Sequence, residues 1–118
     1  MIVCFAALLM VSGVGVAQAQ DALFFDGADE IPVMPGVEEV QARGFRFDKP
    51  EGEIVEVYAD IGAFKPSQVL SFYRQTLPQL GWGRVDADSF YRDAQQLDIS
   101  FSQEAGAHMM RILIRPSL

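Results

Sequence analysis

One segment, from Ser67 to Trp82, constrains the fold more than any other, because it alone has the periodicity of an amphipathic helix. At 100° per residue its bulky apolar side chains fall within an arc of about 160°. These side chains are Val69, Leu70, Phe72, Tyr73, Leu77 and Leu80. Pro66 suits the first turn, with Ser67 as a candidate N-cap. Pro78 is expected to loosen the last turn, and Gly81 to follow it in the left-handed conformation.

A hairpin is predicted before this helix. Phe45 and Phe47 alternate with polar neighbours, and the turn from Lys49 to Gly52 has Pro at its second and Gly at its fourth position. The return strand from Glu53 to Ile61 has an apolar face, formed by Val55, Val57, Ala59 and Ile61. Its other face is expected to be solvated. That face carries Ile54, Glu56, Tyr58 and Asp60.

Four further strands are predicted after the helix, because the rest of the chain is made of short alternating segments separated by turn residues. They are Gly83 to Val85, Ser89 to Asp93, Leu97 to Ser102 and His108 to Arg115. In the second of them the sequence leaves open whether Phe90 or Tyr91 is buried.

The last two of these strands form a hairpin with a self-consistent register. If Glu104 pairs with Ala107, apolar residues face one another on a single side of the sheet. The pairs are Leu97 with Ile114, Ile99 with Ile112, and Phe101 with Met110. On the other side this register sets Ser100 opposite Arg111, with Asp98 diagonal to Arg111 as a weak surface ion pair.

The predicted fold class is α+β. An antiparallel sheet of five to six strands, in the order ββ-α-ββββ, packs against one amphipathic helix and forms a single domain over residues 43–118. An irregular, acidic N-terminal arm at residues 20–42 precedes this domain and is expected to pack on it, because Pro32 and Pro35-Gly36 interrupt any regular element there. One face of the sheet remains partly exposed. It carries Tyr58, Arg111, Leu113 and Arg115.

Residues 1–19 are predicted to be a cleaved secretory signal peptide, so we expect a periplasmic or secreted protein. The run from Ile2 to Val16 is apolar but short for a membrane span, and Ala17-Gln18-Ala19 is a small-x-small cleavage site. No basic residue precedes the run, so either the true start lies upstream or insertion depends on hydrophobicity alone. The alternative is an uncleaved anchor, which would then be the expected membrane contact.

The distribution of charge argues against one class of partner. Eleven acidic and three basic residues lie between Asp21 and Asp60, against five acidic and six basic residues from Ile61 onward. A chain with a formal net charge of −7 is poorly suited to neutralising phosphates. Binding to nucleic acid is therefore not expected.

The residues available for chemistry argue against an enzyme. The only cysteine, Cys4, lies in the predicted signal peptide, and His108 is the only histidine, so the processed chain has no thiol and little choice of general base. Glu56 and Asp60 would lie about 13 Å apart along one strand, too far for a carboxylate pair. The sequence has no phosphate-binding or nucleophile motif. We predict no catalytic residue and no cofactor.

Two clusters suggest a metal site only weakly. The acidic residues within Asp26–Glu30 lack the ligand alternation and closing glutamate of a calcium loop. His108-Met109-Met110 offers imidazole and thioether ligands for copper, but in a strand Met109 points away from the other two. A solvated acidic loop and the edge of a core are the better interpretations, so no metal ligand is predicted.

Three stretches together resemble a known group of proteins. They are FYRQTLPQLGW, the aromatic-Arg strand Phe90-Tyr91-Arg92 with the alternating strand Leu97–Phe101, and the earlier segment FDKPEGEIVEVYA. The chain is similar, from Ile31 to its C-terminus, to small exported bacterial proteins of unknown function with an FY-x3-LP-x-LGW helix end. At the level of the fold it also resembles small helix-on-sheet domains of envelope lipoproteins, which implies an interaction module and no specific chemistry.

These observations predict a non-enzymatic, exported small domain that binds an envelope protein through its exposed sheet face or an edge strand. The alternative is a binder of a small apolar or metal ligand in the space between helix and sheet. The aromatic residues of the helix favour the first hypothesis, because its clean amphipathic arc indicates that they form core and do not line a groove. The oligomeric state is left open by the sequence.

Overall fold

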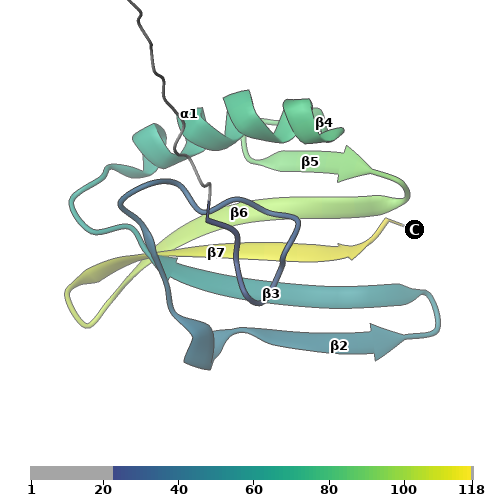
Figure 1. Cartoon of the computed structure of the whole chain (residues 1–118), viewed down its shortest axis with the longest axis horizontal. Helices are drawn as coiled ribbons and strands as arrows, with labels where there is room; N and C mark the ends of the chain where they lie inside the picture. Colours follow the sequence, from purple (N-terminus) through teal and green to yellow (C-terminus); the bar gives the residue numbers. More distant parts are fainter. Residues whose placement is uncertain (1–22, 118) are drawn as a thin grey trace, which may run out of the picture.

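The computed structural model describes residues 23–117, and the predicted signal peptide lies outside this range. The strands are β1 (Glu38–Glu39), β2 (Phe45–Lys49), β3 (Gly52–Asp60), β4 (Gly83–Asp86), β5 (Ser89–Arg92), β6 (Gln95–Glu104) and β7 (Ala107–Pro116). The helices are α1 (Pro66–Thr76) and the short 3-10 helices η1 (Gln41–Arg43) and η2 (Leu77–Leu80). The strands form one antiparallel sheet in the order β1-β3-β7-β6-β5-β4, and β2 also pairs with β3 (Figure 1).

The predicted class, an α+β fold with an antiparallel sheet, is confirmed, and the described residues contain one α-helix. The predicted count of five to six strands is wrong, because the sheet has seven. The additional strand is β1, in which Glu38 and Glu39 pair with Asp60 and Ala59 of β3. This segment was expected to be irregular. β1 lies along the end of β3 that β2 does not reach. There it pairs with backbone groups of β3 that would otherwise need water as a hydrogen-bond partner.

The central hairpin has the predicted register. Glu104 pairs with Ala107, which sets the apolar pairs as expected: Leu97 with Ile114, Ile99 with Ile112, and Phe101 with Met110. Strand β3 extends the same row on the other side of β7, where Val57 lies opposite Ile112. These residues share one side of the sheet, here called the inner face. On β5 it is Phe90 that is buried on this face, while Tyr91 is exposed.

The helix follows the prediction in its body and departs from it at both ends. The cap is Lys65, whose backbone N–H donates to the side chain of Gln68 at 2.8 Å, so the assignment of the cap to Ser67 is wrong. The last turn was expected to loosen at Pro78, but it instead tightens into the 3-10 helix η2, because Pro78 has no backbone N–H to continue the α-helical hydrogen bonding. Gly81 ends it with φ 95°. Trp82 then turns back into the core and is buried.

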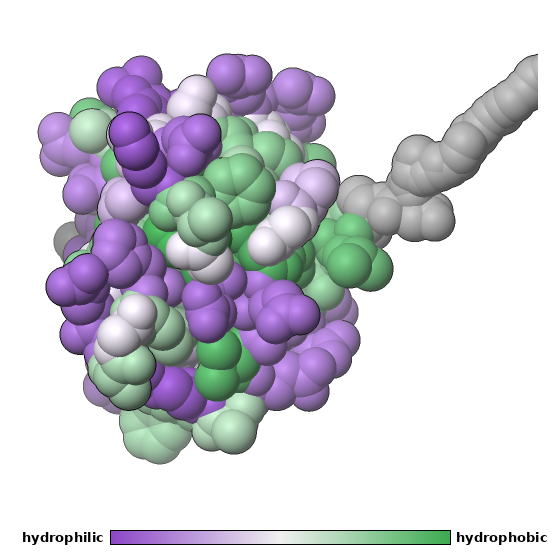
Figure 2. Space-filling view, turned by 90° about the vertical axis from the view of Figure 1, so that its left-hand side faces the viewer, coloured by the Kyte–Doolittle hydropathy of each residue, from purple (hydrophilic) through white to green (hydrophobic). Residues whose placement is uncertain are grey.

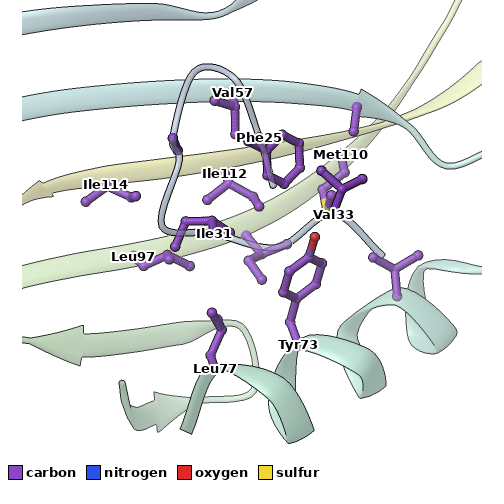
Figure 3. Packing of buried hydrophobic residues seen from close by; sticks show 14 of the residues in the cluster. Phe25, Ile31, Val33, Val57, Tyr73, Leu77, Leu97, Met110, Ile112 and Ile114 are labelled. Atoms are coloured by element: carbon purple, nitrogen blue, oxygen red, sulfur yellow. The ribbon is translucent and has the colours of Figure 1, made fainter. Parts of the chain in front are cut away.

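The segment before β1 fills much of the space between the helix and the inner face. Figure 3 shows Phe25, Ile31 and Val33 lying over the strands, beside Tyr73 of the helix. Phe25 has no exposed surface, and its backbone N–H donates to the carbonyl of Ile31 at 3.0 Å, which closes the loop on itself. The buried hydroxyl of Tyr73 donates to the carbonyl of Pro32 at 2.7 Å. The N-terminal segment and the helix thus form one covering layer.

Replacing Phe25 with Ala should lower the free energy of unfolding by about 3–5 kcal/mol, because it leaves a cavity under the N-terminal segment. Phe24→Ala is the matched control: Phe24 is the preceding residue, is 45% exposed, and should change stability by no more than about 0.5 kcal/mol. Urea unfolding monitored by the fluorescence of Trp82 measures both effects. Equal, small effects would mean that this segment is not part of the core.

Candidate interaction surface

The side of the sheet opposite the inner face, here called the outer face, carries a contiguous apolar patch. On β2, Phe45 and Phe47 are 51% and 55% exposed. Phe47 lies opposite Ile54 of β3, while Phe45 lies opposite Glu56, which in turn lies opposite Leu113 of β7. We call Phe45, Phe47, Ile54 and Leu113 the apolar patch. Exposed aromatic side chains gathered in this way on a sheet are typical of interaction surfaces.

A partly buried ion pair lies beside the apolar patch. Glu56 is 5% exposed, and its carboxylate accepts a hydrogen bond from the guanidinium of Arg111. The expectation that Glu56 lies on a solvated face is therefore wrong. Its flanking residues across the sheet are Phe45 and Leu113, whose side chains exclude water from it, and a carboxylate in such a place requires a paired charge.

The second ion pair of the outer face joins Asp98 to Arg115, at 3.2 Å. The predicted pairing of Asp98 with Arg111 is wrong, because Arg111 turns instead to the more deeply buried Glu56. Asp98 also accepts hydrogen bonds from the hydroxyl of Ser89 at 2.7 Å and the amide of Gln96 at 3.0 Å. Partial burial by itself would raise the pKa of Asp98. The hydrogen bonds and the charge of Arg115 outweigh it and lower the pKa.

Arg43 and Tyr58 border the apolar patch on its η1 side. The guanidinium of Arg43 stacks on the Tyr58 ring at 4.1 Å from its centroid and also pairs with Glu104 of β6. Tyr58 lies opposite Arg111 across β3 and β7. A partner that docks on the patch would therefore meet guanidinium groups from Arg43, Arg111 and Arg115 at its border.

One recess between the N-terminal segment and the sheet is small, with a volume of about 50 Å³, and two wider, more open hollows of about 250 and 500 Å³ border the outside of the same segment. The walls of the small recess include Val55, Trp82 and Arg92. Arg92 stacks on the Trp82 ring at 4.4 Å and pairs with Glu30. Sites for small organic ligands usually have about 300–1,000 Å³, whereas this recess has room for only about four water molecules. The rest of the space between helix and sheet is filled by buried side chains, so no observation favours a ligand there.

The side chains in and around the two clusters considered as metal sites form hydrogen bonds that join different segments of the chain. In the acidic cluster, the carboxylate of Glu39 accepts hydrogen bonds from the backbone of Asp26 and Gly27, at 2.7 and 3.2 Å. His108 has its ring nitrogen 2.7 Å from the amide nitrogen of Gln103, on the opposite strand of the hairpin. Over residues 23–117, no group of three or more His, Cys, Asp or Glu side chains is arranged to hold a metal ion.

Figure 2 shows the end of the molecule at which β3 connects to α1 and β6 turns into β7. Hydrophobic residues gather in the upper middle of this view, hydrophilic residues lie above and below them, and further hydrophobic residues lie at the lower and right edges. The connection from β3 to α1 and the turn between β6 and β7 form a shallow depression here, which His108 lines together with Asp60, Phe64 and Lys65. The depression is open, and its histidine is already in contact with Gln103.

The alternation of the sequence predicts part of the outer face but not its most exposed residues. It placed Tyr58, Arg111, Leu113 and Arg115 there, and all of them alternate with the inner row of their strand. It did not place Phe45 and Phe47 on the same face. The signal was present, since a two-residue turn between Lys49 and Gly52 sets Phe47 opposite Ile54, and residues directly opposite one another share a face.

Comparison of the chain with protein-family models, with curated proteins and with solved structures finds no match. Among residues 23–117 no helix is both long and apolar enough to span a bilayer.

Asp98→Asn tests the network on the outer face. Because the pKa of Asp98 is lowered in the folded chain, its stabilisation is complete above the unfolded value of about 3.9 and is lost as the pH falls through the lower, folded value. The variant should be less stable than the wild type by about 1 kcal/mol at pH 7, and this difference should shrink below about pH 4.

Urea unfolding at a series of pH values measures this difference. Glu51→Gln is the matched control, because Glu51 is an exposed carboxylate in the turn between β2 and β3 and makes no ion pair with the described residues. It should show no comparable difference at pH 7. A penalty for Asp98→Asn that does not change on acidification would contradict the ion-pair account.

Proposed function

We propose that this chain is a non-enzymatic protein-interaction module of the cell envelope, exported to the periplasm, which binds a partner protein through the apolar patch of its outer face. The observation that carries the proposal is the exposure of Phe45 and Phe47, 51% and 55%, on an ordered strand beside a partly buried ion pair. Two adjacent phenylalanines on a rigid sheet supply large apolar contact area with little loss of side-chain freedom on binding.

The surroundings of the patch support recognition of a protein. Aromatic residues at the centre and arginines at the border are the residue types enriched in binding interfaces. Arg111 is anchored on Glu56, and Arg115 on Asp98, so their guanidinium groups are held in place before a partner arrives. Pre-organised groups lose less entropy on binding.

Four side chains that could act as a general acid or base are instead engaged within the domain, which supports a binding role in preference to catalysis. The single histidine contacts Gln103, and the acidic residues Glu30, Glu56 and Asp98 are each paired with an arginine. A general acid or base must be able to reach a substrate, and these groups are committed to contacts within the domain. Export is proposed on the apolar run and cleavage site of residues 1–19 alone.

Pull-down from envelope extracts tests the proposal. The bait is the exported protein, and the test variant is the double substitution Phe45→Thr/Phe47→Thr, which removes both rings and keeps residues that favour strands. Loss of two central aromatic contacts should reduce recovery of the partner at least about tenfold.

The matched control is Tyr91→Thr, which removes a 47% exposed ring from the same face at the far side of the sheet, on β5. This variant should recover the partner as the wild type does. Recovery that is insensitive to the double substitution, with both variants folded by circular dichroism, would rule out the apolar patch as the binding surface.

A further inference from the structure

At Arg46 and Asp48, strand β2 presents backbone groups that pair with no other strand among residues 23–117. The carbonyl of Tyr58 accepts a hydrogen bond from the N–H of Val40, on the side of β3 along which β1 lies. The N–H of Ile61 donates to the carbonyl of His108, on the side of β7. Alternation along β3 therefore directs Gly52, Ile54 and Glu56 towards β2, where they lie opposite Lys49, Phe47 and Phe45. The residues between these, Arg46 and Asp48, must direct their N–H and C=O groups away from β3, to the open edge.

The two ends of the sheet differ in their readiness to accept another strand. At the β4 end the pairing with β5 shifts register between Arg84 and Asp86, an irregularity that bends an edge and discourages pairing. At the β2 end the register is continuous over all five residues from Phe45 to Lys49. The unbroken edge is therefore the one on β2.

The sequence of β2 is complementary to itself in one antiparallel register. If two copies pair about a two-fold axis at Phe47, Arg46 of each lies opposite Asp48 of the other in a hydrogen-bonded pair. If the axis lies at Arg46 or at Asp48, like charges face each other, which is destabilising. Only the axis at Phe47 joins opposite charges and also brings together the backbone groups that face the open edge.

We propose that the partner class of this module includes a second copy of the chain, which pairs antiparallel with β2 about an axis at Phe47. This inference rests on the proposed function, because it names a partner for the same surface. The two sheets become one continuous sheet, and the two Phe47 rings meet on its outer face in a non-hydrogen-bonded pair, where cross-strand side chains are closest. The apolar patches of both copies then form one larger surface.

The pairing is weak and depends on concentration. A five-residue strand buries less area than the roughly 1,200 Å² that stable interfaces require. Arg46 already donates to Glu53 at 2.7 Å and to the carbonyl of Gly27 at 3.1 Å. These contacts compete with its ion pair to Asp48 of the second copy. Charged residues on an edge strand also discourage unspecific pairing, and their order on β2 permits one register alone.

Disulfide trapping tests the axis directly. In a chain carrying Cys4→Ser, the variant Phe47→Cys has a single cysteine at the axis, where the Cα atoms of opposite residues lie about 4.5 Å apart and can form a disulfide. Phe45→Cys is the matched control, with similar exposure on the same face of the same strand. In this register Phe45 lies opposite Lys49, so the thiols of two Phe45→Cys chains lie too far apart to bond. Phe47→Cys should form a covalent dimer at least roughly tenfold faster than Phe45→Cys.

Charge exchange tests the register by a second route. Arg46→Asp and Asp48→Arg should each abolish association, because each places like charges opposite each other. An equimolar mixture of the two variants should restore it, because the introduced aspartate of one chain then faces the introduced arginine of the other, while the second pair keeps its native charges. Sedimentation velocity over a range of concentrations measures association, and circular dichroism confirms that both variants fold.

Equal trapping of the two cysteine variants, or a wild type that is monomeric at millimolar concentration, would overturn the pairing. A patch-dependent partner recovered from envelope extracts in that case would leave the proposed function standing. Association that survives Phe45→Thr/Phe47→Thr, with no other partner recovered, would support edge pairing and reject the patch as the binding surface.

Discussion

The structure depends on covering one apolar face with a helix that is too small to do it alone. An eleven-residue helix is about 16 Å long, whereas the ten-residue strands β6 and β7 are about 33 Å long. The helix supplies Val69 and Tyr73 to the core, and η2, which continues it, supplies Leu77. The remaining area is covered by the loop that contains Phe25, Ile31 and Val33, and the hydrogen bond from Tyr73 to Pro32 joins the two parts of this layer.

This division of the apolar residues leaves the outer face without a second layer in the described part of the chain. The sheet therefore stabilises that face by other means. Glu56 and Arg111 form a partly buried pair, Asp98 and Arg115 a more exposed one, and Arg43 stacks on Tyr58. Phe47 takes no part in these contacts, Phe45 only flanks Glu56, and both rings stay about half exposed. They add little to the stability of the domain, which is why a binding role explains them better than a structural one.

The parts of the fold that could be predicted are those governed by local alternation. The rows of β6 and β7 and the turn at Lys49–Gly52 follow from a two-residue period and from turn chemistry. β1 could not be found in this way, because two residues carry no periodicity and form a strand only where the edge of β3 is free. The burial of Glu56 was also hidden, since it depends on neighbours from two other strands.

The ion pairs of the outer face also could not be predicted from the sequence. Asp98 and Arg111 are diagonal neighbours by register, and the sequence alone favours their pairing. Arg111 pairs with Glu56 because leaving a buried carboxylate unpaired costs more free energy than leaving a partly exposed one unpaired. Asp98 pairs with Arg115 instead. Which carboxylate pairs with which arginine therefore depends on how deeply each carboxylate is buried. That burial depends on the whole sheet and on the residues that flank each group.

The proposed binding role requires the outer face to be bare in the isolated protein and covered in the envelope. Hydroxyl-radical footprinting, read residue by residue by mass spectrometry, tests it most directly when it is applied both to dilute purified protein and to the protein in envelope extracts. Phe45 and Phe47 should react readily in the purified protein and lose most of that reactivity in the extract, while buried Phe25 and Phe90 should react little in both. Equal reactivity of Phe45 and Phe47 in the two settings would contradict it.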